Sequence, residues 1–291
     1  MANLREIKTK IKSVGNLKKI TRALEVVSTV KLQKLKGRAD SLKEYLVDLM
    51  SIVSTVWSVH SIFWESKNTG NKSLTVAFTS ERGLCGWLNS KLLRKISKDL
   101  SEKDSDYFVV GKKWLEYFKR TWGNIVWSLN VGDNFTEKDL LPLFTFFDEA
   151  LAQGEYSEVN LYFNYFKNSI MQIPTKIELY PFKQESFEAF LKDIDIELSQ
   201  PELWNKDLMI EPSVGEYLTE LRRQIRNYVI SSALLQNKTG EHAARMIAMK
   251  NAKDNATEFS KKLKLNFNKA RQGAITQEIS EIVSAKIAIE D

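Results

Sequence analysis

Proline is confined to the middle of this chain, and both ends lack it. All five prolines lie between Pro142 and Pro212, so the first 141 and the last 79 of the 291 residues contain none. Because proline breaks α-helices, its absence permits long helices at both ends. The basic N-terminal residues 1–12 lack the apolar core of a signal peptide, and we expect them to belong to the fold.

The N-terminal residues 1–60 show apolar residues at alternating spacings of three and four. An average spacing of 3.5 predicts a coiled-coil helix. The pattern slips by one residue between Val30 and Leu35, which we interpret as a stutter. At 1.5 Å per residue this helix would be roughly 80 Å long. The positions are Leu4, Ile7, Ile11, Val14, Leu17, Ile20, Leu24, Val27 and Val30, then Leu35, Ala39, Leu42, Leu46, Leu49, Val53 and Val56.

A second long helix is predicted over residues 211–291. Pro212 and Ser213 suit the start of a helix, and Ser213 can cap the first turn. Unbroken, this helix would approach roughly 115 Å, with Gly240 and Gly273 as points of bending. Its apolar positions begin with Val214, Tyr217, Leu218, Leu221, Ile225 and Tyr228, resume with Met246, Met249, Ala252, Ala256, Phe259, Leu263, Phe267 and Ala270, and end with Ile275, Ile279, Ile282 and Ile289. We expect the two ends of the chain to wind together.

Short apolar runs alternate with helical patterns in residues 73–205. This alternation predicts an inserted α/β domain with a mostly parallel sheet. The predicted strands are 74–79, 107–110, 125–129, 159–166 and 176–182. The predicted helices are 88–100, 114–120 and 136–153, the last capped by Thr136.

Positive charge is concentrated in the two predicted helices. Residues 1–40 carry a net charge of +8 and residues 238–272 a net charge of +6, whereas 41–237 is net acidic. Basic ends that pair with each other indicate an acidic partner. Binding to nucleic acid or to a membrane surface would also suit basic helices, and the charge pattern alone leaves these alternatives open.

Motifs for catalysis or cofactor binding are weak. The Gly111-Lys112 pair lacks the other residues of a phosphate-binding loop, and no dinucleotide fingerprint occurs. Cys85 lies in a strand-to-helix turn like that of a nucleophile, but a thiol needs a base, and both histidines, His60 and His242, lie in the predicted end helices. Met246 stands where a metal-binding helix would carry a second histidine. We therefore expect no metal, cofactor or directly bound nucleotide, and keep a thiol enzyme as a rival hypothesis.

Five segments resemble the gamma subunit of F-type ATP synthases. Ile7–Lys34 is similar to its N-terminal helix, and Thr79–Asn89 (TSERGLCGWLN) to its first strand, turn and helix. Gly132–Asn134 matches a short loop. Glu241–Ala256 and Phe267–Ser284 resemble its C-terminal helix. The segments occur in the family's order over the whole chain.

The resemblance implies a Rossmann-like domain inserted between the helices of an antiparallel coiled coil. It implies a non-catalytic rotor, the central stalk inside an alpha/beta hexamer, which transmits torque during proton-driven ATP synthesis or ATP hydrolysis. The implied partners are the alpha, beta and epsilon subunits and the membrane rotor ring, at the cytoplasmic side of a bacterial membrane, and no nucleic acid is expected among them. A gamma-like shaft of a paralogous motor, not coupled to protons, is the alternative.

The resemblance also assigns roles to individual residues. Glu211 matches a residue at the foot that faces the rotor ring, and the turn residues Gly83, Cys85 and Gly86 are structural. The chain departs from the family at Trp87, where a second glycine is usual. Further departures are Leu24 and Val26 in the first helix and Lys286, Glu290 and Asp291 at the C-terminus. The implied contacts to the beta subunits are Lys18, Lys19, Arg22, Arg245, Arg271, Gln272, Thr276 and Glu278.

Overall fold

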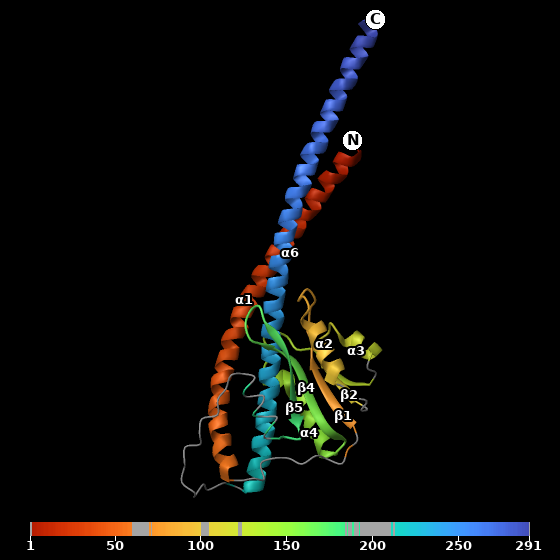
Figure 1. Cartoon of the computed structure of the whole chain (residues 1–291). Helices are drawn as coiled ribbons and strands as arrows, with labels where there is room; N and C mark the ends of the chain where they lie inside the picture. The colour runs from red at the N-terminus through yellow and green to blue at the C-terminus, as the bar shows by residue number, and fades with distance from the viewer. Residues whose placement is uncertain are drawn as a thin grey trace. The chain divides into compact units, whose positions relative to one another are not determined.

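The computed structural model describes residues 2–59, 72–99, 105–121, 124–183 and 213–290, with the single residues 70, 185, 188, 192 and 211. In the sequence, a segment of alternating strands and helices separates two long helices, and its strands form one sheet (Figure 1). This arrangement confirms the predicted fold class. The chain divides into two compact units. One comprises Met1–Ser28 and Met246–Asp291, and the other comprises Thr29–Arg245.

The long helices are α1 (Ala2–Val59) and α6 (Val214–Glu290), and each contributes to both units. The helix α6 continues through both Gly240 and Gly273, so neither glycine ends it. The Ser213 hydroxyl accepts the backbone N–H of Glu216 at 3.3 Å, which confirms the predicted cap. His60, Pro212 and Asp291 lie outside the described residues, as do the side chains of Ile289 and Glu290.

The sheet has the order β3-β2-β1-β4-β5. β1 to β4 run parallel, and β5 pairs with β4 in the antiparallel direction. Every strand and helix predicted for the middle of the chain is present, with bounds that differ by a few residues. The strands are β1 (Lys72–Phe78), β2 (Ser105–Val110), β3 (Ile125–Leu129), β4 (Tyr156–Phe166) and β5 (Gln172–Tyr180). The helices between them are α2 (Leu88–Asp99), α3 (Leu115–Thr121) and α4 (Glu137–Ala152).

The two faces of the sheet are covered by different helices. On one face, Ala77 of β1 packs with residues of β2, α2 and α3 around Phe118. On the other face, Val76 and Phe78 of β1 join a larger core with α4, the second half of α1 and the first half of α6 (Figure 1). Residues that alternate along β1 therefore point to opposite layers, as the pleat of a strand requires. The long helices are part of the main core of the Thr29–Arg245 unit.

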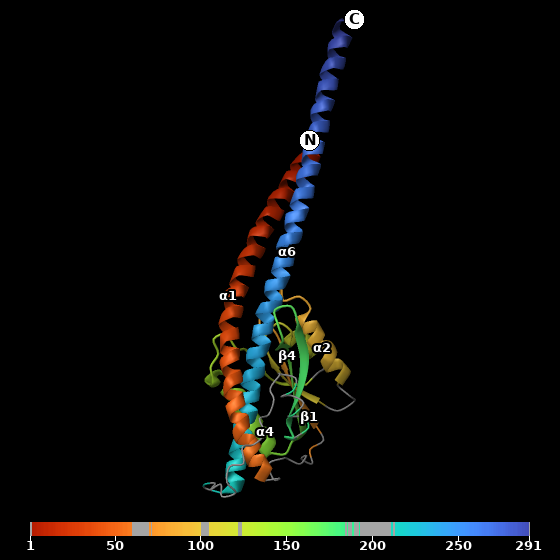
Figure 2. The ribbon, with the colours of Figure 1, turned by 60° about the vertical axis from the view of Figure 1, so that its left-hand side comes forward.

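In each unit the segments of α1 and α6 lie side by side and run in opposite directions (Figures 1 and 2). In the Met1–Ser28 and Met246–Asp291 unit, the Lys253 ammonium donates to the Glu25 carboxylate at 2.8 Å. In the other unit the Tyr228 hydroxyl donates to the Leu42 carbonyl, and the Tyr45 and Tyr228 rings lie 5.2 Å apart. The predicted antiparallel pairing of the two end helices is thus confirmed within each unit.

The predicted apolar stripe of α1 is wrong in its middle section. Leu17, Ile20 and Val30 are 51%, 57% and 61% exposed, whereas the small polar residues Thr21 and Ser28 are buried. The buried seam keeps a strict seven-residue period without a stutter, as a coiled coil requires. Its positions are the buried Thr21, Ser28, Leu35 and Leu49 with the half-buried Val14 and Leu42, and the buried Leu32 and Ala39 lie beside them with the same period.

Thr21 and Ser28 explain why apolarity alone misses the seam. Both side chains are small, so they fit between closely packed helices. The Thr21 hydroxyl donates to the Leu17 carbonyl of its own helix at 3.0 Å, which satisfies the buried hydroxyl. The displaced apolar residues are left on the surface of α1.

Leu35→Ala should lower the free energy of unfolding by about 2–5 kcal/mol, because a fully buried leucine leaves a cavity. The side chain of Leu35 is only 2% exposed. Val30→Ala is the matched control, and an exposed change of this kind alters stability by about 0.5 kcal/mol or less. Urea unfolding followed by circular dichroism measures both. Equal losses at the two positions would contradict the observed seam.

Candidate interaction surfaces and a buried charge cluster

The C-terminal part of α6 exposes apolar side chains. Every described side chain from Ile275 to Lys286 is exposed, including Ile279, Ile282 and Val283. The apolar positions Ile275, Ile279 and Ile282 of the predicted helix are therefore not buried within this unit. A run of exposed large apolar residues on a helix is typical of a surface that binds a partner.

Most of the predicted beta-contact residues lie on the surface of the same unit. Lys18, Lys19 and Arg22 are exposed on α1. On α6 the exposed members are Arg271, Gln272, Thr276 and Glu278. The Thr276 hydroxyl donates to the backbone carbonyl of Gln272 at 3.0 Å, within the same helix. These side chains are thus exposed on two segments of the unit, 18–22 of α1 and 271–278 of α6.

Arg245 is placed differently, in the buried part of the Thr29–Arg245 unit. Its side chain is 7% exposed and donates to the Glu241 carboxylate at 2.6 Å. It also donates to the backbone carbonyls of Arg82 and Gly83 at 3.1 and 3.2 Å. Arg245 is thus engaged within its own chain, where it holds the turn after β1.

That turn contains the three residues expected to be structural. Gly86 has a φ of +60°, a left-handed conformation that glycine adopts without strain. Gly83 receives the Arg245 bond, and Cys85 is 4% exposed, with Sγ 3.7 Å from the Ser80 hydroxyl. Burial raises the pKa of the Cys85 thiol, which disfavours the thiolate that a nucleophile needs. The structure thus offers no support for a thiol enzyme.

Glu241 lies at the centre of a buried charge cluster in this unit. Its carboxylate accepts the backbone N–H groups of Glu81 and Arg82, at 3.3 and 3.4 Å, in addition to the Arg245 guanidinium. The Glu81 carboxylate in turn accepts the backbone N–H of Val131 at 3.1 Å. These bonds connect α6 to the loops that follow β1 and β3.

Lys238 reinforces the second of these loops. Its ammonium is 3% exposed and donates to the Val131 carbonyl. Burial lowers the pKa of Lys238, and the nearby carboxylates of Glu241, Asp133 and Glu81 oppose that effect. The Lys238 ammonium therefore has a structural role, because it is buried, has acidic neighbours and donates to a carbonyl.

The loop 131–135 is also held by α1. The Asp133 carboxylate bonds to His242 at 3.0 Å and accepts the Lys31 ammonium at 2.5 Å. These hydrogen bonds, that from His242 above all, hold the pKa of Asp133 well below its usual value. His242, considered above as a metal ligand, is therefore bonded to a carboxylate.

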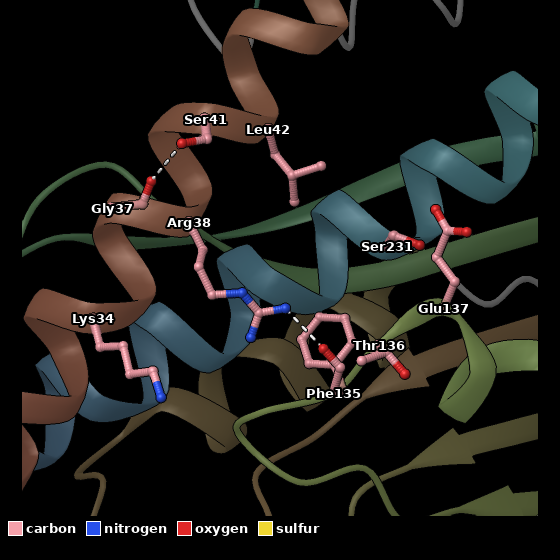
Figure 3. Close-up of a pocket in the computed structure, with 9 residues that line it drawn as sticks. All are labelled: Lys34, Gly37, Arg38, Ser41, Leu42, Phe135, Thr136, Glu137 and Ser231. Atoms are coloured by element: carbon pink, nitrogen blue, oxygen red, sulfur yellow. Dashed lines mark hydrogen bonds between the residues drawn. The ribbon is translucent and has the colours of Figure 1, made fainter.

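A hollow of about 620 Å³ lies beside this loop, between α1, the start of α4 and Ser231 of α6 (Figure 3). Its cations are already engaged. Arg38 donates to the carbonyls of Asp133 and Phe135, at 3.2 and 2.8 Å, and Lys34 donates to the Asn134 side chain at 3.0 Å. Both cations that line the hollow therefore already donate to neutral oxygens of the loop.

Glu241, Lys238 and Glu81 are not distinguished by any motif of the sequence. The sequence does carry a signal, because large apolar residues are absent from this helix between Leu235 and Met246. A helical stretch without an apolar face is either solvated or buried among polar partners, and only the structure separates the two. Glu211, the predicted foot residue, is exposed, and its sequence neighbours 210 and 212 lie outside the described residues.

Comparison with known proteins gives a consistent result over the whole chain. A family model described as ATP synthase matches residues 3–289. An ATP synthase gamma chain of Buchnera aphidicola is 33% identical over 299 residues, with 99% of each chain covered. That of Stenotrophomonas maltophilia (strain R551-3) is 34% identical over 300 residues, covering 99% of this chain and 100% of the relative.

Solved structures share the fold. A chain of the Euglena gracilis mitochondrial ATP synthase (OSCP/F1/c-ring, rotational state 3) matches with a TM-score of 0.72 and 17% identity, covering 99% of this chain and 95% of the other. A chain of the Tetrahymena thermophila central stalk and c-ring matches with a TM-score of 0.58 and 22% identity, covering 80% and 99%. None of the described helices has an apolar stretch long enough to cross a bilayer.

Asp133→Asn should lower the free energy of unfolding at neutral pH by about 1.5–3 kcal/mol, since charge-assisted bonds are lost. The folded-state pKa of Asp133 lies below its unfolded value. Its contribution is therefore complete above the unfolded pKa of about 3.9 and is lost as the pH falls through the folded pKa. The difference from the unchanged chain should persist down to about pH 4 and shrink below it.

Denaturant unfolding over a pH series measures this difference. Glu258→Gln is the control, because this exposed carboxylate also bonds a lysine, Lys262, but in solvent. It should leave stability unchanged. A difference for Asp133→Asn that stays constant down to about pH 2 would contradict the ionic role of this carboxylate.

Proposed function

The chain belongs to the ATP synthase gamma-chain family, and we propose that it is the central-stalk subunit of an F-type ATP synthase. In this role it transmits torque between a membrane rotor ring and a catalytic alpha/beta hexamer. The observation that carries the proposal is the match to gamma chains over 99% of this chain, at 33–34% identity. The partners named in the titles of the matched structures, F1 and the c-ring, supply the surroundings of such a stalk.

The long helices suit the mechanical part of this role. A shaft must resist bending and twisting, and two paired helices with a buried seam are stiffer than one. Exposed apolar side chains such as Ile279 and Ile282 would face the surrounding hexamer, where few strong polar bonds form. Nucleotide-driven closing of the beta subunits would push such a shaft in sequence, and rotation driven from the membrane would force the same sites open.

Charge complementarity supports the proposed partners. Residues 1–40 carry a net charge of +8, and we propose that acidic segments of the beta subunits act on them. The proposed contacts on the exposed surface are Lys18, Lys19, Arg22, Arg271, Gln272, Thr276 and Glu278. Arg245, also expected at this contact, is engaged by Glu241, so we propose that its main bonds are internal.

We propose further that the chain is non-catalytic and that ATP chemistry takes place on other subunits. The buried Cys85 thiol, with its raised pKa, argues against the thiol-enzyme alternative. Glu211 is proposed to face the rotor ring, with the epsilon subunit docked on the α/β domain. The complex would place the chain at the cytoplasmic side of a bacterial membrane. A motor not coupled to protons is the alternative, which a measurement of proton pumping separates.

Arg271→Glu should slow ATP hydrolysis by the complex of this chain with alpha and beta subunits of the same source. The expected loss is about tenfold, because a charge-assisted bond to a beta subunit would become a repulsion. The measurement is steady-state hydrolysis by the purified complex. Lys91→Glu, on the exposed face of α2 in the α/β domain, makes the same change in net charge and should leave the rate unchanged.

The unchanged chain must first co-elute with the alpha and beta subunits in size-exclusion chromatography. Elution of the chain alone, with no effect on hydrolysis, would contradict the proposed function. Equal slowing by Arg271→Glu and Lys91→Glu would contradict the assignment of Arg271 while leaving the assembly intact.

A further inference from the structure

The sheet has a topological switch point between β1 and β4. From β1 the chain continues to β2 and β3 on one side, whereas β4 lies on the other side of β1. In open α/β sheets this arrangement leaves a crevice at the carboxyl ends of the two strands, and ligands bind there. The turn 79–87 after β1 and the end of β4 around Asn164 border this crevice.

The chain's own helix α6 occupies this crevice. The Asn237 side chain accepts the backbone N–H and the side-chain amide of Asn164 at 3.1 and 3.0 Å. At Gly240 a Cβ would lie 3.7 Å from the Asn164 carbonyl and 3.3 Å from Gln172 Cγ. The glycine thus lets α6 come close to the end of the sheet (Figure 1).

Residues 237–243 of α6 are all buried, over about two turns of helix. A helix on a protein surface buries only one face. Here the buried face includes polar and charged residues, among them Lys238 at 3% exposure and Thr239 at 0%. This stretch is therefore enclosed by the unit rather than lying on its surface, and its buried polar groups need partners inside the chain.

The Glu241 carboxylate takes the position of a ligand's anion. In a dinucleotide-binding fold, backbone N–H groups of the turn after the first strand hold the phosphate of the nucleotide. In this chain the N–H groups of Glu81 and Arg82, in that same turn, donate to Glu241. Arg245 supplies a cation to the same carboxylate and also donates to the carbonyls of Arg82 and Gly83.

We propose that residues 237–245 of α6 are an internal ligand of the α/β domain, with the Glu241 carboxylate in the place of a ligand's anion. This segment fills the nucleotide crevice and fixes the rotational position of the domain on α6. Glu241 is thus a positioning residue. The second part of the proposal rests on the proposed central-stalk function, because there the α/β domain must turn together with the helix without slipping.

Glu241→Ala in the purified full-length chain tests the internal ligand. It leaves Arg245 and two N–H groups without their carboxylate, and the melting temperature should fall by roughly 6–12 °C. Sodium formate at about 0.1 M, compared with sodium chloride at equal ionic strength, should recover part of this loss by supplying a small carboxylate. Formate should not raise the melting temperature of the unchanged chain or of Glu258→Ala, an exposed control on the same helix.

Glu241→Gln keeps the side-chain volume and an acceptor oxygen, so it guards against a variant that fails to fold. It should lower the melting temperature by less than Glu241→Ala does. It should show no response to formate, because the glutamine side chain still occupies the position of the Glu241 carboxylate. Either an unchanged melting temperature for Glu241→Ala, or a loss that formate does not reduce at all, would overturn the anion assignment.

The positioning role is tested in the complete complex in sealed vesicles. Glu241→Gln should pump fewer protons for each ATP hydrolysed than the unchanged complex, whereas Glu258→Gln should pump as many. Equal pumping by Glu241→Gln would overturn the positioning role. Failure of the unchanged chain to assemble would instead contradict the central-stalk function, and the formate result would still decide the internal ligand.

Discussion

Within the Thr29–Arg245 unit, the structure depends on the burial of α6 between α1 and the end of the sheet. Over residues 237–243 this helix has no solvent-facing side. The two charged side chains of this stretch, Glu241 and Lys238, are satisfied within the chain by bonds to the loops after β1 and β3. Because these bonds are buried, breaking one leaves a charge without a partner, so each of them stabilises the packing of residues 237–245 against the α/β domain.

The sequence alone was sufficient to predict the elements and their class. Proline placement and 3/4 apolar spacing indicated α1 and α6, and alternation predicted each strand of the sheet. The Ser213 cap was found where predicted. The helices, the strands and the cap depend on residues close together in the sequence. They could therefore be predicted without knowing which distant segments are in contact.

The contacts between segments could not be read in the same way. The seam of α1 uses Thr21 and Ser28, and their burial depends on the partner helix rather than on their own polarity. The stretch 237–245 contains polar and charged residues and yet is the most enclosed part of α6, which its composition does not reveal. Arg245 was expected to contact a beta subunit because the resemblance placed it on the shaft, and the structure shows it bonded to Glu241.

Rotation of this chain during ATP hydrolysis tests the central claim most directly. A bead can be attached through Lys112→Cys, an exposed position in the α/β domain, while Cys85 stays buried. In a complex immobilised through its alpha/beta hexamer, the account predicts that the bead turns in one direction through full circles when ATP is supplied. ATP hydrolysis at the normal rate with a stationary bead would contradict it.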